Sequence, residues 1–166
     1  QSPRYDQDWF TGLDATLAYT MVRAAKPKQI IEIGSGHSTR FMARAISDGE
    51  LDTRLISIDP APRRAIDTLF HHVERRPLDG VALKLVSQLE HGDVLFLDGS
   101  HVLMPGTDVD LLGTHILPAL AGGTLVHVHD LFLPDDYPRE WRWRNYNEQS
   151  LICALVGARR LSVEFA

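Results

Sequence analysis

The sequence lacks several features that would place it in a special class of proteins. It holds one cysteine, Cys153, among 166 residues, which excludes an internal disulfide and a metal site built from cysteines. No apolar run approaches the roughly 18–20 residues that a membrane-spanning helix needs, so we expect no partner in the membrane. The formal net charge is −5, and no overall positive charge is present to attract nucleic acid. A soluble protein of the reducing cytoplasm fits these absences best.

The sequence also lacks internal repeats and low-complexity tracts. Its length suits one domain over residues 1–166, and 44% apolar and 23% charged residues are ordinary for a globular protein. The first residue is Gln1 rather than Met, and no charged leader with an apolar core follows it. We therefore expect Gln1 to be an internal position of a longer or trimmed chain.

Short apolar segments alternate with segments of helical periodicity along most of the chain. We predict strands over 29–33, 54–58, 71–76, 93–97 and 124–128, and helices over 8–25, 38–46, 62–70, 81–89 and 109–120. Nearly continuous apolar strands separated by helices indicate an α/β fold with a doubly wound, mostly parallel sheet covered by helices on both faces. Ligands of such sheets bind beyond the carboxyl ends of the strands. The residues that directly follow each strand are therefore the candidate site residues.

A glycine-rich turn follows the first predicted strand. Gly34 and Gly36 allow a sharp turn and a close approach to a ligand, and the next helix offers free N–H groups. The dinucleotide-binding pattern requires a third glycine at position 39, where this chain has Thr39. A tight turn without any ligand is the alternative interpretation.

The second predicted strand ends in a carboxylate. At this position Asp59 can accept hydrogen bonds from both hydroxyls of an adenosine ribose. Because Asp59 precedes Pro60, a helix-capping role without a ligand is the alternative.

Acids and imidazoles follow the fourth and fifth predicted strands. If these strands are neighbours, Asp98 lies close to His129 and Asp130, and such a set suits Mg²⁺ or Mn²⁺, with Zn²⁺ or Fe²⁺ as further options. The alternative is a buried, hydrogen-bonded pair of His129 and Asp130. We expect His127 to point to the opposite face or end of the pleat and to have a structural role.

Aromatic residues and arginines alternate in the segment 131–144, which also contains Asp135, Asp136 and Glu140. The segment could cap a substrate pocket, with arginines pairing with a carboxylate or phosphate and rings stacking on an apolar body. It could equally be a solvated turn that packs Trp141 or Trp143 on the sheet. The interleaved acids argue against nucleic acid as its partner.

The segment 30–36 together with Asp59 resembles the first two cofactor motifs of class I S-adenosylmethionine-dependent methyltransferases. The segments 97–101 and 123–131 are similar to the bacterial branch close to catechol and caffeoyl-coenzyme A O-methyltransferases. The similarity covers roughly residues 9–148. It implies a Rossmann-like methyltransferase fold, S-adenosylmethionine as the cofactor, and a small-molecule acceptor that is methylated on oxygen.

The resemblance also implies which residues of this chain contact the cofactor. They are Glu32, Gly34, Ser35, Gly36, Ser38, Asp59 and Asp98. The loop 34–36 would line the methionine end of the cofactor, Glu32 would support the loop, and Asp59 would hold the ribose.

A divalent ion and a catalytic base are implied by the same resemblance. The catechol-type enzymes hold the ion by an acid after the fourth strand and an Asp-Asn pair after the fifth, and the matching positions here are Asp98, His129 and Asp130. The His-Asp pair departs from the family pattern, and Mg²⁺ is the default ion. The catalytic lysine of the family, three residues after the first metal ligand, is matched by His101.

A base at this position suits methyl transfer, which is an in-line displacement that needs an acceptor oxygen losing its proton. A histidine with a pKa near 6.5 can take that proton at neutral pH, and a metal bound to the same oxygen would lower the pKa of the acceptor. Alternatively, His101 only hydrogen-bonds the Pro-Gly loop after it. Two other functions stay open: a cofactor-binding module without catalysis, and an NAD-dependent oxidoreductase, which Thr39 disfavours. The short chain also leaves room for a homodimer in which a second subunit shapes the pocket.

Overall fold

The computed structural model describes residues 2–10, 12–62 and 66–165. The chain forms one five-stranded sheet in which every pair of neighbours is parallel, in the order β3-β2-β1-β4-β5. The strands are β1 (Gln29–Ile33), β2 (Arg54–Ile58), β3 (His72–Glu74), β4 (Val94–Leu97) and β5 (Leu125–Val128). The predicted α/β class with a parallel, Rossmann-like sheet is therefore confirmed.

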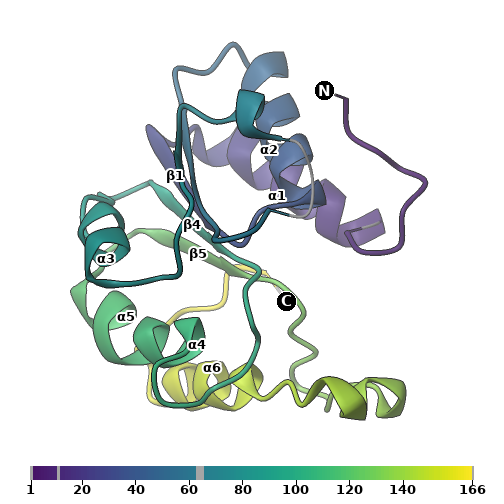
Figure 1. Ribbon diagram of the computed structural model, residues 1–166, viewed down its shortest axis with the longest axis vertical. Helices are drawn as coiled ribbons and strands as arrows, with labels where there is room; N and C mark the ends of the chain where they lie inside the picture. Colours follow the sequence, from purple (N-terminus) through teal and green to yellow (C-terminus); the bar gives the residue numbers. More distant parts are fainter. Residues whose placement is uncertain (1, 11, 63–65, 166) are drawn as a thin grey trace.

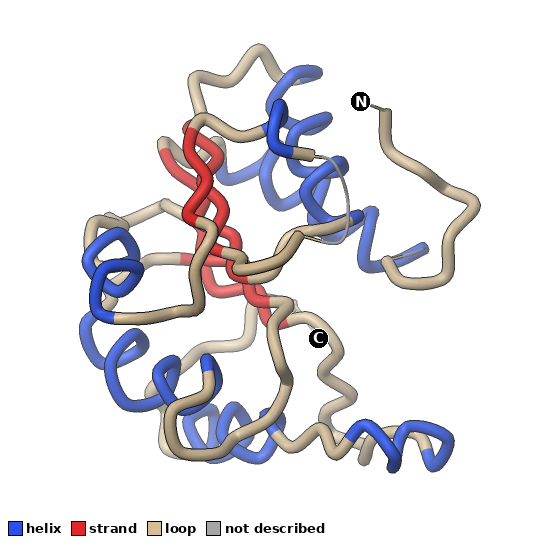
Figure 2. The backbone as a smooth tube through the Cα atoms, viewed as in Figure 1, coloured by secondary structure: helices blue, strands red, loops and turns tan. Residues whose placement is uncertain are grey.

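Helices cover both faces of the sheet, as Figures 1 and 2 show. In chain order the helical elements are α1 (Gly12–Ala25), α2 (His37–Asp48), η1 (Asp67–Leu69), α3 (Gly80–Val86), α4 (Asp108–Leu111), η2 (Leu112–Ile116), α5 (Leu117–Ala119), η3 (Arg139–Arg144) and α6 (Glu148–Gly157). Alternate residues of each strand point to opposite faces, so Ile30 and Phe96 pack with α1 and α2, whereas Ile31 and Leu95 pack with α3, η2 and α6.

The register of the strands aligns their carboxyl ends at one edge of the sheet. Ile33 of the central strand β1 pairs with Ile58 on one side and with Leu97 on the other, and Leu97 pairs with Val128. The residues that follow these strands in sequence, which include Gly34, Asp59, Asp98 and His129, consequently meet at this edge.

Two predicted helices begin or extend differently in the structure. The helix expected over 8–25 starts at Gly12, because the Gln7 side-chain oxygen accepts the N–H groups of Trp9 and Phe10 and holds that segment in a turn. Of the helix expected over 62–70, residues 63–65 lie outside the described residues, and the described part forms only η1. The chain turns to extended backbone at Phe70, and the strand expected over 71–76 is reduced to β3.

The other helix limits also shift, for local reasons. The helix expected over 81–89 is α3, which begins at Gly80 beside its N-cap Asp79 and ends at Val86, before a tighter final turn. The helix expected over 109–120 is divided into α4, the π-helical turn η2 and α5. Pro118 lies next to this wide turn, and a proline ring can neither donate a hydrogen bond nor tolerate the carbonyl four residues earlier in a regular helix.

The helix α6 was not among the predicted elements, although Ile152, Leu155 and Val156 have helical spacing. Its Ile152 is buried in the same core as α3 and η2, and Leu151 lies where a side-chain carbon on Gly113 would approach it to 2.9 Å. The C-terminal segment is therefore part of the sheet's helical cover.

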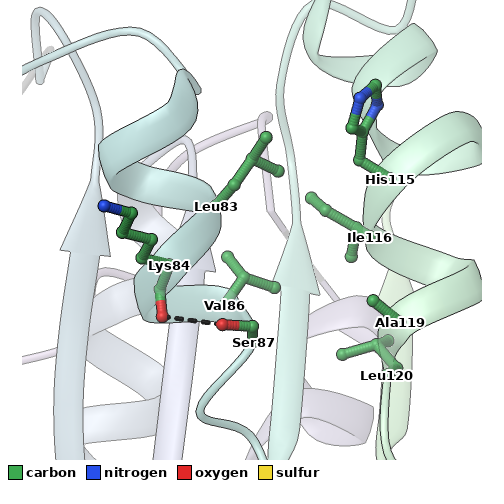
Figure 3. A pocket seen from close by; sticks show the side chains of 8 residues that line it. All are labelled: Leu83, Lys84, Val86, Ser87, His115, Ile116, Ala119 and Leu120. Atoms are coloured by element: carbon green, nitrogen blue, oxygen red, sulfur yellow. Dashed lines mark hydrogen bonds between the residues drawn. The ribbon is translucent and has the colours of Figure 1, made fainter.

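No helix in the described part of the chain is long and apolar enough to span a membrane. A hollow of about 250 Å³ lies between α3 and the segment of η2 and α5, where Leu83 and Val86 face Ile116 and Leu120 (Figure 3). This hollow is largely apolar, and none of its lining residues lines the pocket at the carboxyl edge of the sheet.

Candidate active site

The larger pocket, of about 750 Å³, opens at the carboxyl edge of the sheet. One end is lined by the loop 34–36, the end of β2 and the segment 77–78. The other end is lined by His101, Asp130, Arg144 and Tyr146. This volume is in the usual range for small-molecule sites, and the two ends differ in chemistry.

The loop after β1 approaches the end of β4 very closely at Gly34. A side-chain carbon there would lie 1.9 Å from the backbone oxygen of Asp98, and the φ of +78° is one that favours glycine. Gly36 lines the pocket, and a side-chain carbon on it would meet no atom within 4 Å. Gly34 is thus required by the fold, whereas Gly36 keeps open space at the pocket.

The fully buried Glu32 ties this loop to α2. Its two carboxylate oxygens each accept a hydrogen bond of 2.6 Å, one from the Ser38 hydroxyl and one from the Thr39 hydroxyl. The Thr39 hydroxyl in turn accepts the Gly36 N–H at 3.1 Å. Burial raises the pKa of Glu32 to about 8, although both hydroxyls act in the opposite direction. Glu32 therefore supports the loop from beneath, and Ser38, predicted to contact the cofactor, is buried beside it.

Asp59 connects the end of β2 to the same loop. One carboxylate oxygen accepts the Ser35 N–H at 2.8 Å and the Ser35 hydroxyl at 3.0 Å, and the other accepts the Ala61 N–H at 2.8 Å. Asp59 also lines the pocket. It holds a local turn through the Ala61 N–H and at the same time borders the predicted cofactor space.

The structure brings Asp98, His129 and Asp130 together, as the neighbouring β4 and β5 predicted. His129 Nδ1 lies 3.4 Å from Asp98 Oδ1 and 3.3 Å from Asp130 Oδ1, and His129 Nε2 lies 3.7 Å from Asp14 Oδ2. The Nδ1 contacts have ion-pair distances without hydrogen-bond alignment, and this buried atom has no hydrogen-bond partner among the described residues.

His101 lies beside Asp98 and Asp130, and its other ring nitrogen contacts Glu148, a residue that was not predicted from the sequence. Its Nδ1 lies 2.5 Å from the buried Glu148 Oε1, whereas its Nε2 lies 3.3 Å from Asp98 Oδ1 and 3.9 Å from Asp130 Oδ2. The only hint of Glu148 in the sequence is an acid on the apolar side of a short helix, four residues before Ile152. The Pro-Gly loop is therefore not the partner of the His101 side chain.

The charges around the two imidazoles change their titration. Burial alone would lower the pKa of His101, but Asp98 and Glu148 outweigh it and raise the pKa to about 9. Burial likewise opposes Asp14 and Asp98 at His129, whose pKa rises to about 10. Burial works against the ionised form of Asp98, yet both imidazoles hold its pKa well below the usual range. The expected His101 pKa near 6.5 is thus wrong, because three carboxylates surround the ring.

The structure does not show the metal site that was predicted at Asp98, His129 and Asp130. Among residues 2–10, 12–62 and 66–165, no group of three or more His, Cys, Asp or Glu side chains is arranged to hold a metal ion. Asp98 and Asp130 instead face the ring nitrogens of both His101 and His129.

The predicted direction of His127 was wrong. Residues two apart on a strand share a face, and His127 lies with His129 on the α1 side of the sheet. His127 stacks on Phe96 with ring centroids 4.4 Å apart, and Phe10 contacts both Phe96 and His129. Burial and the neighbouring His129 lower the pKa of His127 to about 4, so it is a neutral, structural side chain.

The segment 131–144 lies partly at the pocket and partly in solvent, and its aromatic rings contact one another. The Trp141 ring packs against the rings of Phe132 and Tyr146, with centroid distances of 5.1 and 5.9 Å, whereas the Trp143 side chain is 76% exposed. Arg144 reaches the pocket, but Arg139 and Arg142 are exposed. One arginine of the three therefore borders the site.

The comparison with known protein families identifies residues 31–131 as a methyltransferase domain. The match covers more than half of the chain and includes the loop after β1, Asp59, Asp98 and the end of β5. No curated protein matches the sequence.

Proposed function

Because the chain belongs to the methyltransferase domain family, we propose that it transfers a methyl group from S-adenosylmethionine to an oxygen of a small-molecule acceptor. The observation that carries the proposal is one continuous pocket that joins the loop 34–36 and Asp59 to His101 and Tyr146. Its volume leaves room for a donor at one end and an acceptor at the other.

The donor end has the residues that a nucleoside with a methionine tail requires. The glycine loop offers backbone close to the ligand, and Asp59 offers a carboxylate to the ribose hydroxyls. Each carboxylate oxygen has two acceptor positions, and among the described residues one Asp59 oxygen accepts a single N–H, that of Ala61. An acceptor position on Asp59 thus remains for the ribose.

His101 is the residue that we assign to the acceptor oxygen. The contact with Glu148 orients the ring, so Nδ1 is occupied and Nε2 faces Asp98 and Asp130, two residues that line the pocket. In the step, the acceptor oxygen forms a bond to the methyl carbon, the carbon–sulfur bond of the sulfonium breaks, and the acceptor proton moves to Nε2 of an unprotonated His101. Because the pKa of His101 is raised to about 9, this unprotonated form is the minor one at neutral pH, and turnover should rise as the pH approaches 9. Asp98 and Glu148 stabilise the resulting imidazolium, and Glu148 is a positioning residue.

Calorimetric titration with S-adenosylhomocysteine tests the donor end. Asp59→Ala should abolish measurable binding, because both the ribose acceptor and the anchor of the loop are lost. Ser35→Ala removes one hydroxyl contact to Asp59 but leaves the carboxylate in place, so it should weaken binding less than Asp59→Ala. Unchanged affinity of Asp59→Ala would contradict the proposal.

Turnover tests the acceptor end, with S-adenosylhomocysteine release as the measurement. His101→Ala should retain cofactor affinity and lower kcat by roughly 100-fold or more, the usual range for a general base. Glu148→Gln keeps the shape of the side chain and should lower kcat less. Equal kcat in His101→Ala and the wild type would remove His101 from the reaction.

A divalent ion at Asp98, His129 and Asp130 stays a prediction from the resemblance, and we derive no step through it. Dialysis against a chelator followed by activity measurement with and without Mg²⁺ tests it. Loss and recovery of activity would support the ion, and activity that the chelator leaves unchanged would contradict it.

A further inference from the structure

Arg144 stands at the acceptor end of the pocket, inside a group of aromatic rings. Its guanidinium carbon lies 4.0 Å from the centroid of Trp141, 5.4 Å from that of Trp143 and 5.5 Å from that of Tyr146. The ring of Trp9, from the segment before α1, lies 5.8 Å away. These contacts hold a half-buried cation in one place, because guanidinium groups stack favourably on aromatic faces.

Arg144 forms no ion pair with a carboxylate among the described residues. Burial raises the pKa of Asp130, and the nearby charge of Arg144 is one of the weaker effects that lower it. Three other arginines, Arg44, Arg75 and Arg76, each form an ion pair with a carboxylate. Arg144 instead donates from Nη1 to the Tyr146 hydroxyl at 3.3 Å, and its buried Nε has no hydrogen-bond partner in the described part of the chain. The carboxylate of Asp130, which lines the same pocket, lies within ion-pair distance of His101 and His129.

A partly buried guanidinium with unused donors is suited to a planar anion. Arginine stays charged at all ordinary pH values and presents a fork of N–H groups that matches a carboxylate or phosphate. Leaving such a group without a partner costs free energy, which a bound anion would recover.

The position of Arg144 determines where a bound anion would lie relative to His101. Tyr146 contacts the His101 ring at 4.3 Å between centroids on one side and the guanidinium at 5.5 Å on the other. Both His101 and Arg144 line the same pocket. One small molecule can therefore reach Nε2 of His101 with its hydroxyl and Arg144 with a group at its opposite end.

We propose that the methyl acceptor is a small hydroxylated molecule that carries a carboxylate or phosphate group, and that Arg144 recognises this anion. The inference rests on the proposed methyl transfer, for which it defines the substrate class. The aromatic rings hold the guanidinium, and the anion fixes the acceptor so that its hydroxyl faces His101.

Calorimetric titration of the protein saturated with S-adenosylhomocysteine tests the inference, with 4-hydroxybenzoate and 4-hydroxyphenyl phosphate as anionic probes and 4-hydroxybenzamide as the neutral one. The wild type should bind an anionic probe at least tenfold more tightly than the amide. Whichever anionic probe has the lower Kd indicates whether the site prefers a carboxylate or a phosphate. Arg144→Gln should abolish this preference, because a hydrogen-bonded charge pair contributes about that much. Arg142→Gln, an exposed arginine of the same turn, should keep it.

The inference is overturned if the wild type shows no preference for the anionic probes over the amide, or binds no probe at all. It is also overturned if Arg144→Gln keeps this preference, or if Arg142→Gln loses it to the same extent as Arg144→Gln. If Arg144 only supports the fold, Arg144→Gln lowers the melting temperature and weakens acid and amide equally, which also overturns it. S-adenosylhomocysteine is titrated first on each variant. Absence of its binding in the wild type would refute the proposed function, whereas normal binding without an anion preference would refute only the substrate class.

Discussion

Gly34 and Gly36 stand two positions apart in one loop and meet different surroundings. Gly36→Ala should change the melting temperature little, because the added methyl meets no protein atom within 4 Å. It should weaken S-adenosylhomocysteine binding roughly tenfold or more, since the methyl enters the space that the cofactor would occupy. Thermal unfolding and calorimetric titration measure the two effects.

Gly34→Ala is the contrasting variant. Its methyl would collide with the backbone of Asp98, so both stability and binding should fall. A Gly36→Ala protein that binds the cofactor normally would show that the methionine end lies elsewhere.

The buried Glu32 should make stability depend on pH. Its pKa is about 8 in the folded protein and near 4.5 when unfolded, so between these values the unfolded chain loses its proton first and stability falls as pH rises. Glu32→Gln cannot ionise and keeps the size of the side chain. The free energy of unfolding of the wild type should fall relative to Glu32→Gln by about 1.4 kcal/mol per pH unit between pH 5 and 8. Urea unfolding at several pH values measures this, and parallel pH profiles would contradict it.

At the scale of elements, the strands were easier to predict than the helices. Buried parallel strands are continuous apolar runs, and four of the five lie within one residue of their predicted limits. Helix limits depend on contacts that the apolar pattern does not carry, such as the Gln7 side chain before α1 or the π-helical turn before Pro118. The short η1 is another helix that the apolar pattern could not delimit, because the chain turns to extended backbone at Phe70 and then enters β3.

The start of α3 rests on a single side chain. Asp79 Oδ1 accepts the N–H groups of Val81 and Ala82 at 2.9 and 3.1 Å, which satisfies donors that a helix leaves free. Asp79→Ala should lower the free energy of unfolding by about 1 kcal/mol, measured by urea unfolding. Asp79→Asn retains the acceptor oxygen and should lose less. Equal stability of all three proteins would show that α3 does not need this cap.

At the scale of the whole molecule, the site residues that could be predicted are those that directly follow a strand in the sequence. Gly34, Asp59, Asp98 and Asp130 were found because parallel strands end at one edge, a rule that needs no tertiary contacts. Glu148 and Tyr146 come from the chain at and just before α6, and only the packing of that helix brings them to His101. A pairing between residues 47 positions apart leaves no periodic signal in the sequence.

Because the pocket is built from the ends of β1, β2 and β4 and from the segment before α6, a ligand there should stabilise the fold as one unit. A ligand at 100 times its Kd adds about 2.7 kcal/mol to the free energy of unfolding, which is roughly 5–10 °C in Tm for a chain of this size. S-adenosylhomocysteine should produce such a shift in a thermal unfolding experiment, and NAD at the same concentration should produce none, because Thr39 stands where the dinucleotide motif needs glycine. Asp59→Ala should remove the shift. An equal shift with NAD, or none with S-adenosylhomocysteine, would contradict the cofactor assignment, since binding at this pocket cannot leave the stability of its walls unchanged.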